Sequence, residues 1–251
     1  MVLQIGAQAK AAIRQNAHNE GLKLKLSLYE RIIRTCNVAS RAEVKLSSFV
    51  HGFSSSIETY KIIQRTKAVP SVPKVRFAQF IEFSAAMYSG AIQMISIIER
   101  WQILDPRMVV FQTAINVALH DTREAEAAYV RDCASLMPSE MASQPGTLFP
   151  WSPPNSEQEE LLRIRTEDLL DALMKLGNVI YDFTVEMQNS LLGDLFQNRI
   201  PARTPVDPRF IVVTLDNHAH LASYFEKETA WGKVKSDTEK RVRENLTGAG
   251  K

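Results

Sequence analysis

The sequence predicts an all-α protein, a bundle of about six to eight helices of which several are long. The 11 prolines fall in clusters and leave long proline-free segments, and proline is excluded from helix interiors because it lacks an N–H and clashes with the preceding turn. Within those segments the apolar residues recur at the spacing of one helix face. Ser-x-x-Glu capping boxes and Asp-Pro pairs mark several helix starts.

The composition is that of a globular chain. Of its 251 residues 45% are hydrophobic and 23% are charged, which is ordinary usage for a folded protein. We expect one helical domain over residues 1–246, with 138–155 as the alternative internal boundary, and a disordered tail at 247–251.

The first quarter is predicted to form three helices. An Ala-rich helix over residues 2–15 would end at Asn19-Glu20-Gly21, and Gly21 would begin the link to the next helix. The alternation of leucines at 22, 24, 26 and 28 leaves a strand open, but the continuation to Ile33 favours a helix. Ser40 and Glu43 form a capping box, after which Leu46 opens a clear amphipathic stripe that continues to residue 63.

The segment from 75 to 104 is apolar around the whole helix circumference, which predicts a central helix covered by its neighbours. Its uncharged run, residues 83–98, is shorter than the roughly 20 apolar residues that a membrane span needs. We therefore expect no transmembrane span. Ala86 and Gly90 are four residues apart, so a second helix can approach closely there.

Asp105 and Pro106 predict the start of a helix that runs to about Leu136. The proline-rich residues 138–155 form the longest predicted loop. A capping box at Ser156 and Glu159 opens the longest helical pattern, which ends near Gln197 and is expected to form the centre of the bundle together with the 75–104 helix.

The C-terminal quarter contains one candidate strand and one helix. Residues 210–214 are largely β-branched and read as a short strand. Residues 221–246 are predicted to form an amphipathic helix that docks on the chain's own core or on a neighbour. Its apolar stripe consists of Leu221, Tyr224, Phe225, Trp231, Val242 and Leu246.

Charge is distributed unevenly along the chain. Residues 1–67 contain 11 Lys and Arg against 4 Asp and Glu, whereas residues 138–199 contain 4 against 10. On one continuous helix five basic residues would fall within an arc of roughly 80°: Lys23, Arg31, Arg34, Arg41 and Lys45. Such a stripe suits phosphate backbones or anionic lipid head groups. The alternative is a charged surface that faces the chain's own acidic segment.

Motifs that carry catalysis are absent from the sequence. It has no glycine-rich phosphate loop, no nucleophile elbow, no H-E-x-x-H and no paired C-x-x-C. His218 and His220 beside Asp216 are too few to form a zinc site, and we interpret them as surface histidines at a helix start. We therefore expect no cofactor and no metal, and consider an enzyme the weaker hypothesis. Because Cys36 and Cys133 are the only cysteines, we expect an intracellular, cytoplasmic protein.

The function these observations favour is that of a non-enzymatic helical interaction or assembly protein. It would act through helix-face packing, with charge asymmetry setting the orientation, on a protein partner or on a second copy. The predicted partner contacts are Phe149, Trp151 and Trp231. The alternative is a polyanion-binding protein, for RNA packaging or attachment to an anionic membrane surface, that uses the basic residues.

Overall fold

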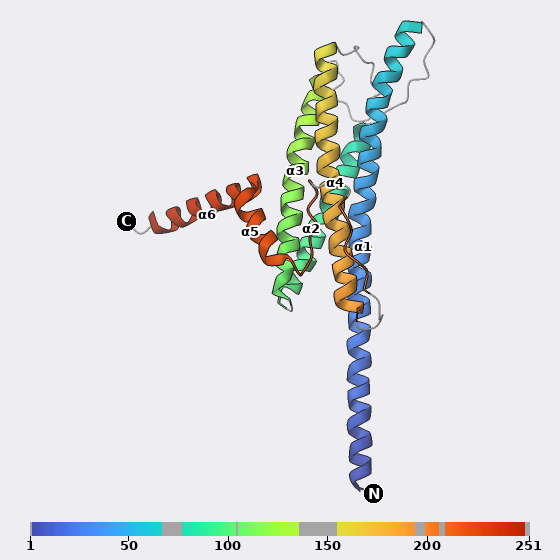
Figure 1. Ribbon diagram of the computed structural model, residues 1–251, viewed down its shortest axis with the longest axis vertical. Helices are drawn as coiled ribbons and strands as arrows, with labels where there is room; N and C mark the ends of the chain where they lie inside the picture. Colours follow the sequence, from blue (N-terminus) through green and yellow to red (C-terminus); the bar gives the residue numbers. More distant parts are fainter. Residues whose placement is uncertain are drawn as a thin grey trace.

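The computed structural model describes residues 2–66, 77–103, 105–135, 155–193, 199–205 and 209–248. Within these ranges the chain forms six α-helices and one short 3-10 helix, and no strand. The predicted all-α bundle is therefore confirmed. Figure 1 shows four long helices side by side, with two shorter helices at one flank.

The first two helices, α1 (Val2–Thr66) and α2 (Phe77–Trp101), run antiparallel. The rings of Phe49 and Phe80 are 5.6 Å apart, and further along both helices Gly90 lies against Ala39. The predicted close approach at Gly90 is thus confirmed, with α1 as the helix that approaches.

The fourth long helix, α4 (Ser156–Leu192), also runs antiparallel to α1. The hydroxyls of Ser54 and Thr166 are hydrogen-bonded at 3.3 Å near the start of α4, and Tyr29 donates to Gln188 at 2.9 Å near its end. With α3 (Val109–Ser135) packed between α2 and α4, the four helices form an up-down-up-down bundle.

The prediction of three separate helices in the first quarter is wrong, because α1 is one helix of 65 residues. Gly21 costs a helix only about 1 kcal/mol relative to alanine, and a capping box at Ser40 would need a non-helical backbone there. Buried residues continue on one face straight across Ser40, among them Cys36, Ala39 and Ala42. The packing of this face against α2 and α4 outweighs both local signals.

The other two predicted helix starts are essentially correct. Asp105 caps the 3-10 helix Pro106–Met108, accepting a hydrogen bond from the Arg107 N–H, and α3 follows directly. The capping box of α4 lies one residue earlier than predicted, between Asn155 and Gln158. Both pairs fit the sequence pattern, but only Asn155 has the extended backbone of a cap.

The helix predicted to be covered on all sides, α2, is covered on one side only. Met87, Ala91 and Met94 are fully buried, whereas Ile81 and Ile92 are 59% and 57% exposed. The stretch Gln79–Trp101 is long and apolar enough to cross a membrane, and 39% of the window that qualifies is buried. Core helices of soluble proteins pass the same test, so the expectation of no transmembrane span stays a prediction.

Residues 209–215, predicted to contain a strand, form a turn, bends and irregular backbone and pair with no strand in the described part of the chain. Side chains satisfy their backbone groups instead. Asp182 accepts from the Val213 N–H, and Asn217 both accepts from the Thr214 N–H and donates to the Val212 carbonyl. Val213 and Leu215 are buried, so this segment packs on the core as an arm along α4.

The predicted C-terminal helix is two helices, α5 (His218–Glu228) and α6 (Ala230–Gly248), divided at Thr229. Thr229 has an extended backbone, and its hydroxyl accepts from the Gly232 N–H at 3.1 Å. A Cβ at Gly232 would lie 2.2 Å from the Glu226 carbonyl oxygen, so this turn requires glycine. Figure 1 shows α6 directed away from the bundle. The helix α6 ends at Gly248, so it includes two of the residues that were expected to form a disordered tail.

Candidate functional site

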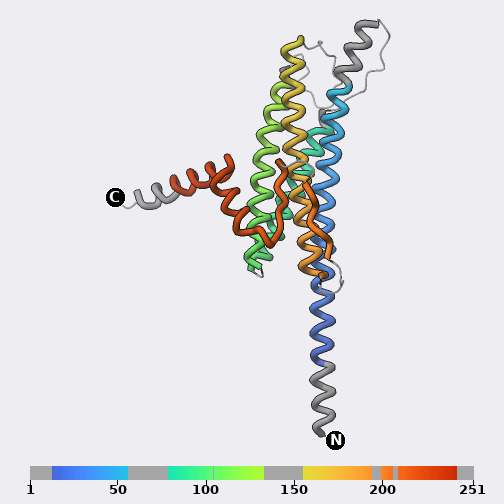
Figure 2. The backbone as a smooth tube through the Cα atoms, in the orientation of Figure 1, coloured from blue at the N-terminus to red at the C-terminus, as the bar shows by residue number. Residues whose placement is uncertain are grey.

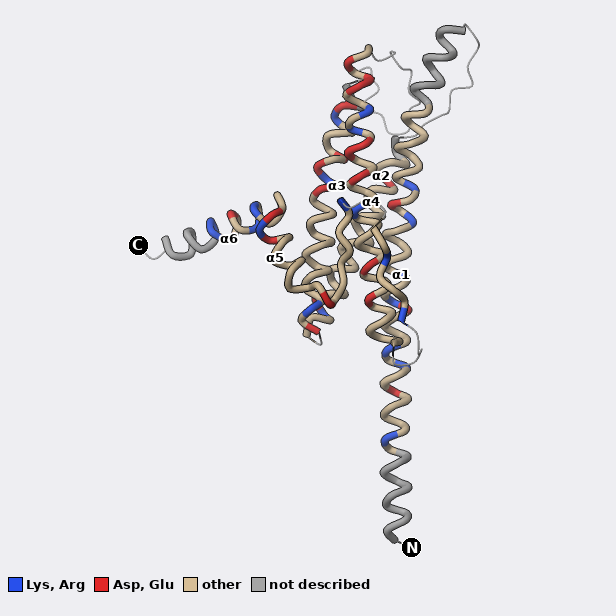
Figure 3. The backbone as a smooth tube through the Cα atoms, viewed as in Figure 1, with Lys and Arg blue, Asp and Glu red and all other residues tan. Residues whose placement is uncertain are grey.

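The continuity of α1 places the five predicted basic residues on a single helix, where a regular helix puts them within an arc of roughly 80°. Figure 3 shows basic residues, in blue, at intervals along α1. All five side chains are exposed: Lys23, Arg31, Arg34, Arg41 and Lys45. We call this set the basic stripe. The sequence left its existence dependent on a helix through Ser40, and the structure supplies that helix.

The basic stripe is not neutralised by the chain's own acidic segment within the described residues. Its only ion pair there joins Lys23 to Glu20 on the same helix, at 2.9 Å. Lys45 lies over the ring of Phe83, 5.4 Å from its centroid.

Several acidic residues of α4 pair with other cations among the described residues. Arg163 pairs with Glu160 and Glu167, Arg165 with Asp168, and Arg209 with Asp171. The basic stripe therefore faces solvent, and its guanidinium groups are available to another molecule.

The N-terminal part of α1 extends beyond the end of the bundle (Figure 2). We define residues 13–28 as the projecting segment. None of these residues is buried, and Ile13, Leu24 and Leu26 are 67%, 70% and 41% exposed. Leu28, at its end, packs against the core, but Ile13 and Leu24 are large apolar side chains that the bundle leaves exposed.

A surface groove of about 560 Å³ lies at the opposite end of the bundle, between α1 and the first turns of α4. We call it the α1–α4 groove. Leu162 and Thr166 form its floor and are buried. Its rim on the α4 side carries Glu160 and Glu167. Serines and His51 make up much of the remaining lining, so the groove is largely polar, with leucine at its floor and an acidic edge.

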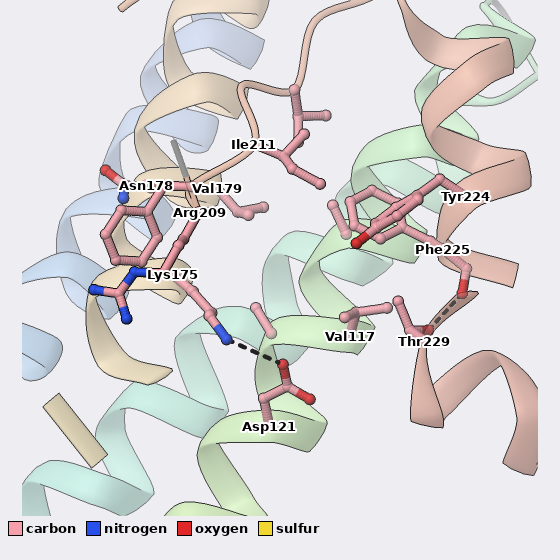
Figure 4. A pocket seen from close by; sticks show the side chains of 14 residues that line it. Val117, Asp121, Lys175, Asn178, Val179, Arg209, Ile211, Tyr224, Phe225 and Thr229 are labelled. Carbon is pink, nitrogen blue, oxygen red and sulfur yellow. Dashed lines mark hydrogen bonds and ion pairs between the residues drawn. The ribbon is translucent and has the colours of Figure 1, made fainter. Parts of the chain in front are cut away.

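A smaller cavity of about 140 Å³ lies between α3, α4, the 209–213 arm and α5 (Figure 4). Its walls are mostly apolar, and include Val117, Ile211 and Phe225. Lys175 and Asp121 lie at its edge with their charged groups 3.9 Å apart. A cavity of this size holds a benzene-sized molecule, and the residues that line it include no nucleophile paired with a base.

A buried ion pair holds the arm that closes this cavity. Arg203 donates to both carboxylate oxygens of Asp182, at 2.8 and 3.0 Å, and also to the Ile211 carbonyl at 2.8 Å. Burial raises the pKa of Asp182, while Arg203 and the Val213 N–H act in the opposite direction. Asp182 therefore fixes both the 199–205 and the 209–215 stretches against α4.

Sequence reasoning missed the Asp182–Arg203 pair. The signal available was a single carboxylate between Tyr181 and Phe183 on a face otherwise apolar. Buried carboxylates are rare unless they are paired, so Asp182 implied a cation, but nothing in the sequence identified Arg203 as that cation.

The predicted partner contacts fall in different places. Phe149 and Trp151 lie outside the described residues. Trp231 is half-buried against the core at the start of α6, with the Lys235 ammonium 5.4 Å from its ring centroid. The structure therefore places Trp231 at the edge of the chain's own fold.

No group of three His, Cys, Asp or Glu in the described part of the chain could hold a metal ion. The Nδ1 of His218 is 2.8 Å from the Leu215 carbonyl oxygen at the start of α5. His218 therefore lies at a helix start as predicted, although its side chain is half-buried, whereas His220 is exposed. Burial raises the pKa of Cys36 to about 11, so its thiol stays protonated at neutral pH and is a poor nucleophile.

Comparisons with known proteins give no match: no family model matches the chain, and no curated protein and no solved structure is significantly similar to it.

Proposed function

We propose that this protein is an assembly protein that associates with copies of itself through the projecting segment of α1. The observation that supports this proposal is the exposure of Ile13 and Leu24, each about two-thirds exposed, on a helix that extends past its own bundle. Burying these side chains would remove apolar surface from water, so packing against another chain would stabilise the segment.

The arrangement of the apolar residues favours helix packing over a membrane surface. On a regular helix Leu22 and Leu26 form one stripe, and Ile13, Ala17 and Leu24 form a second stripe roughly 180° away. A helix that lies on a membrane presents one apolar face and one polar face. Two apolar stripes separated by basic residues suit a helix that packs between other helices.

The experiment is a measurement of native mass over a range of protein concentrations by light scattering. Leu24→Gln with Leu26→Gln removes two exposed leucines and retains helix propensity, because glutamine is a good helix former. The wild type should exceed the mass of one chain, and this variant should move towards it. The matched control, Asn16→Gln with Ser27→Gln on the same segment, should behave as the wild type.

Either of two results contradicts the proposal. One is a wild-type chain that remains monomeric at high concentration. The other is an association that is equally strong in the leucine variant and in the control.

Polyanion binding is the second candidate, and it is favoured by the exposure of Arg31, Arg34 and Arg41 without an acidic partner in the described residues. A phosphate-binding surface loses affinity steeply between low and moderate salt, because bound counterions are released. Binding of a single-stranded RNA and of vesicles that contain anionic lipid should be measured separately at two salt concentrations. Changing the three arginines to glutamine should remove the salt-sensitive binding if this candidate is correct.

A further inference from the structure

We infer that the projecting segment of one copy docks in the α1–α4 groove of a second copy, and that the second copy does the same in return. The product is an antiparallel dimer with two equivalent contacts. This inference rests on the self-association proposed above and identifies the surface that receives the segment.

The groove has the chemistry to receive a basic, leucine-bearing helix. Its floor includes the buried Leu162 and the half-buried Leu170. On its rim the side chains of Glu160 and Glu167 are 57% and 61% exposed. Both pair with Arg163, but such exposed pairs contribute little, so an incoming cation can share these carboxylates.

The projecting segment has the complementary pattern. Leu22 and Leu26 form a stripe, and Lys23 and Lys25 lie roughly 80° to either side of it on a regular helix. The lysine stems can cover apolar surface while their ammonium groups reach the rim. One lysine then meets the acidic wall formed by α4, and complementary charge fixes the register of the helix in the groove.

The occupant must come from another chain. Leu24 and Ser54 lie on the same continuous helix, and 30 residues of helix span about 45 Å. A straight helix cannot fold back on itself, so the projecting segment cannot reach its own groove.

In each copy the same length of α1 separates the projecting segment from the α1–α4 groove, and this equality favours a closed pair. When two α1 helices lie antiparallel with Leu24 of each copy opposite Ser54 of the other, both segments enter grooves at once. Such a two-fold contact is self-complementary and ends assembly at two chains. A parallel, head-to-tail contact would leave one groove and one segment open and would continue to grow.

The test is a charge exchange, read as native mass against concentration. Lys23→Glu with Lys25→Glu, and separately Glu160→Lys with Glu167→Lys, should each weaken the dimer by at least about tenfold. The chain that carries all four changes should recover it, because its acidic segment then meets a basic groove. As a control, Lys233→Glu with Lys240→Glu reverses two exposed lysines of α6 and should leave the dimer unchanged.

A second variant tests the groove from its other wall. His51→Trp adds bulk on α1 without altering the Arg163 ion pairs, and it should also weaken the dimer; far-UV circular dichroism checks that each variant is folded. The inference is overturned if the groove variants dimerise normally, if the four-fold exchange does not recover association, or if the wild type grows beyond two chains. If the leucine variant dissociates while the groove variants do not, self-association stands and this docking site is wrong.

Discussion

Gly90 of α2 lies so close to Ala39 of α1 that a Cβ added at Gly90 would be 2.9 Å from the Ala39 Cβ and 2.9 Å from its backbone nitrogen. The nearest atoms include backbone, which cannot rotate away. The two helices therefore cross where both have the smallest side chains, and this contact fixes the position of α2 on α1.

Replacing Gly90 with valine should separate these helices. Overpacking of a close-packed core typically costs about 1–3 kcal/mol, and we expect a loss of that size in the free energy of unfolding, measured by urea denaturation. Gly52 offers the matched control, because nothing lies within 4 Å of a Cβ added there. Gly52→Ala should stabilise α1 by up to about 1 kcal/mol, and a similar loss in both variants would contradict the crossing.

Removing the buried carboxylate of Asp182 should lower the free energy of unfolding by more than Gly90→Val does. Its side chain is 3% exposed and that of Arg203 is 13% exposed, so Asp182→Ala leaves a largely buried guanidinium without its anion. Breaking such a pair costs about 3–5 kcal/mol. Asp171→Ala breaks the exposed pair with Arg209, 3.0 Å apart, and should cost less than about 1 kcal/mol. Equal losses in the two variants would show that the arm is not held by Asp182.

Glu43 should make stability depend on pH. Burial raises the pKa of this carboxyl in the folded chain, and a hydrogen bond from Ser47 partly opposes the shift. A pKa raised on folding gives a stabilising contribution below the unfolded pKa, and this contribution is lost as the pH rises through the folded pKa.

Glu43→Gln removes this titration and should therefore raise the free energy of unfolding at about pH 7 relative to the wild type, with the difference shrinking towards about pH 4. Glu30→Gln, at an exposed position of the same helix, is the control for the removal of one carboxylate from α1 and should change the free energy of unfolding little. A difference for Glu43→Gln that does not change with pH would refute the assignment.

Phe225 and Trp231 should contribute differently to the free energy of unfolding. Phe225, on α5, is 7% exposed, and truncating a buried phenylalanine to alanine costs about 3–5 kcal/mol. Trp231 is half-buried where α6 leaves the bundle, so Trp231→Ala should cost clearly less, in proportion to the smaller apolar area that it covers. If Trp231→Ala costs as much as Phe225→Ala, or if it lowers the native mass, then α6 packs against more than this structure shows.

The sequence by itself determined the fold class and the approximate extent of α2, α3 and α4. Proline clusters and the Asp105 cap act locally, so the start of α3 could be read without knowing any neighbour. The close approach at Gly90 could also be predicted from the sequence, because a small residue on a helix of mostly bulky residues leaves room for another backbone. The basic stripe was predicted only on the condition that the helix continues through Ser40, and the capping signal at Ser40 opposed that condition.

Tertiary structure decided how far α1 extends and where the chain departs from regular structure. The signals at Gly21 and Ser40 are worth about 1 kcal/mol each, and burial of a face that includes Ala39 and Ala42 outweighs them. Among the residues that the structure describes, the 209–215 arm has no partner strand, because side chains of Asp182 and Asn217 bind its backbone groups. Local propensity determines which segments can form helices. Where local signals conflict with tertiary packing, packing determines the outcome, because the summed free energy of burial exceeds the free energy of a single cap or glycine.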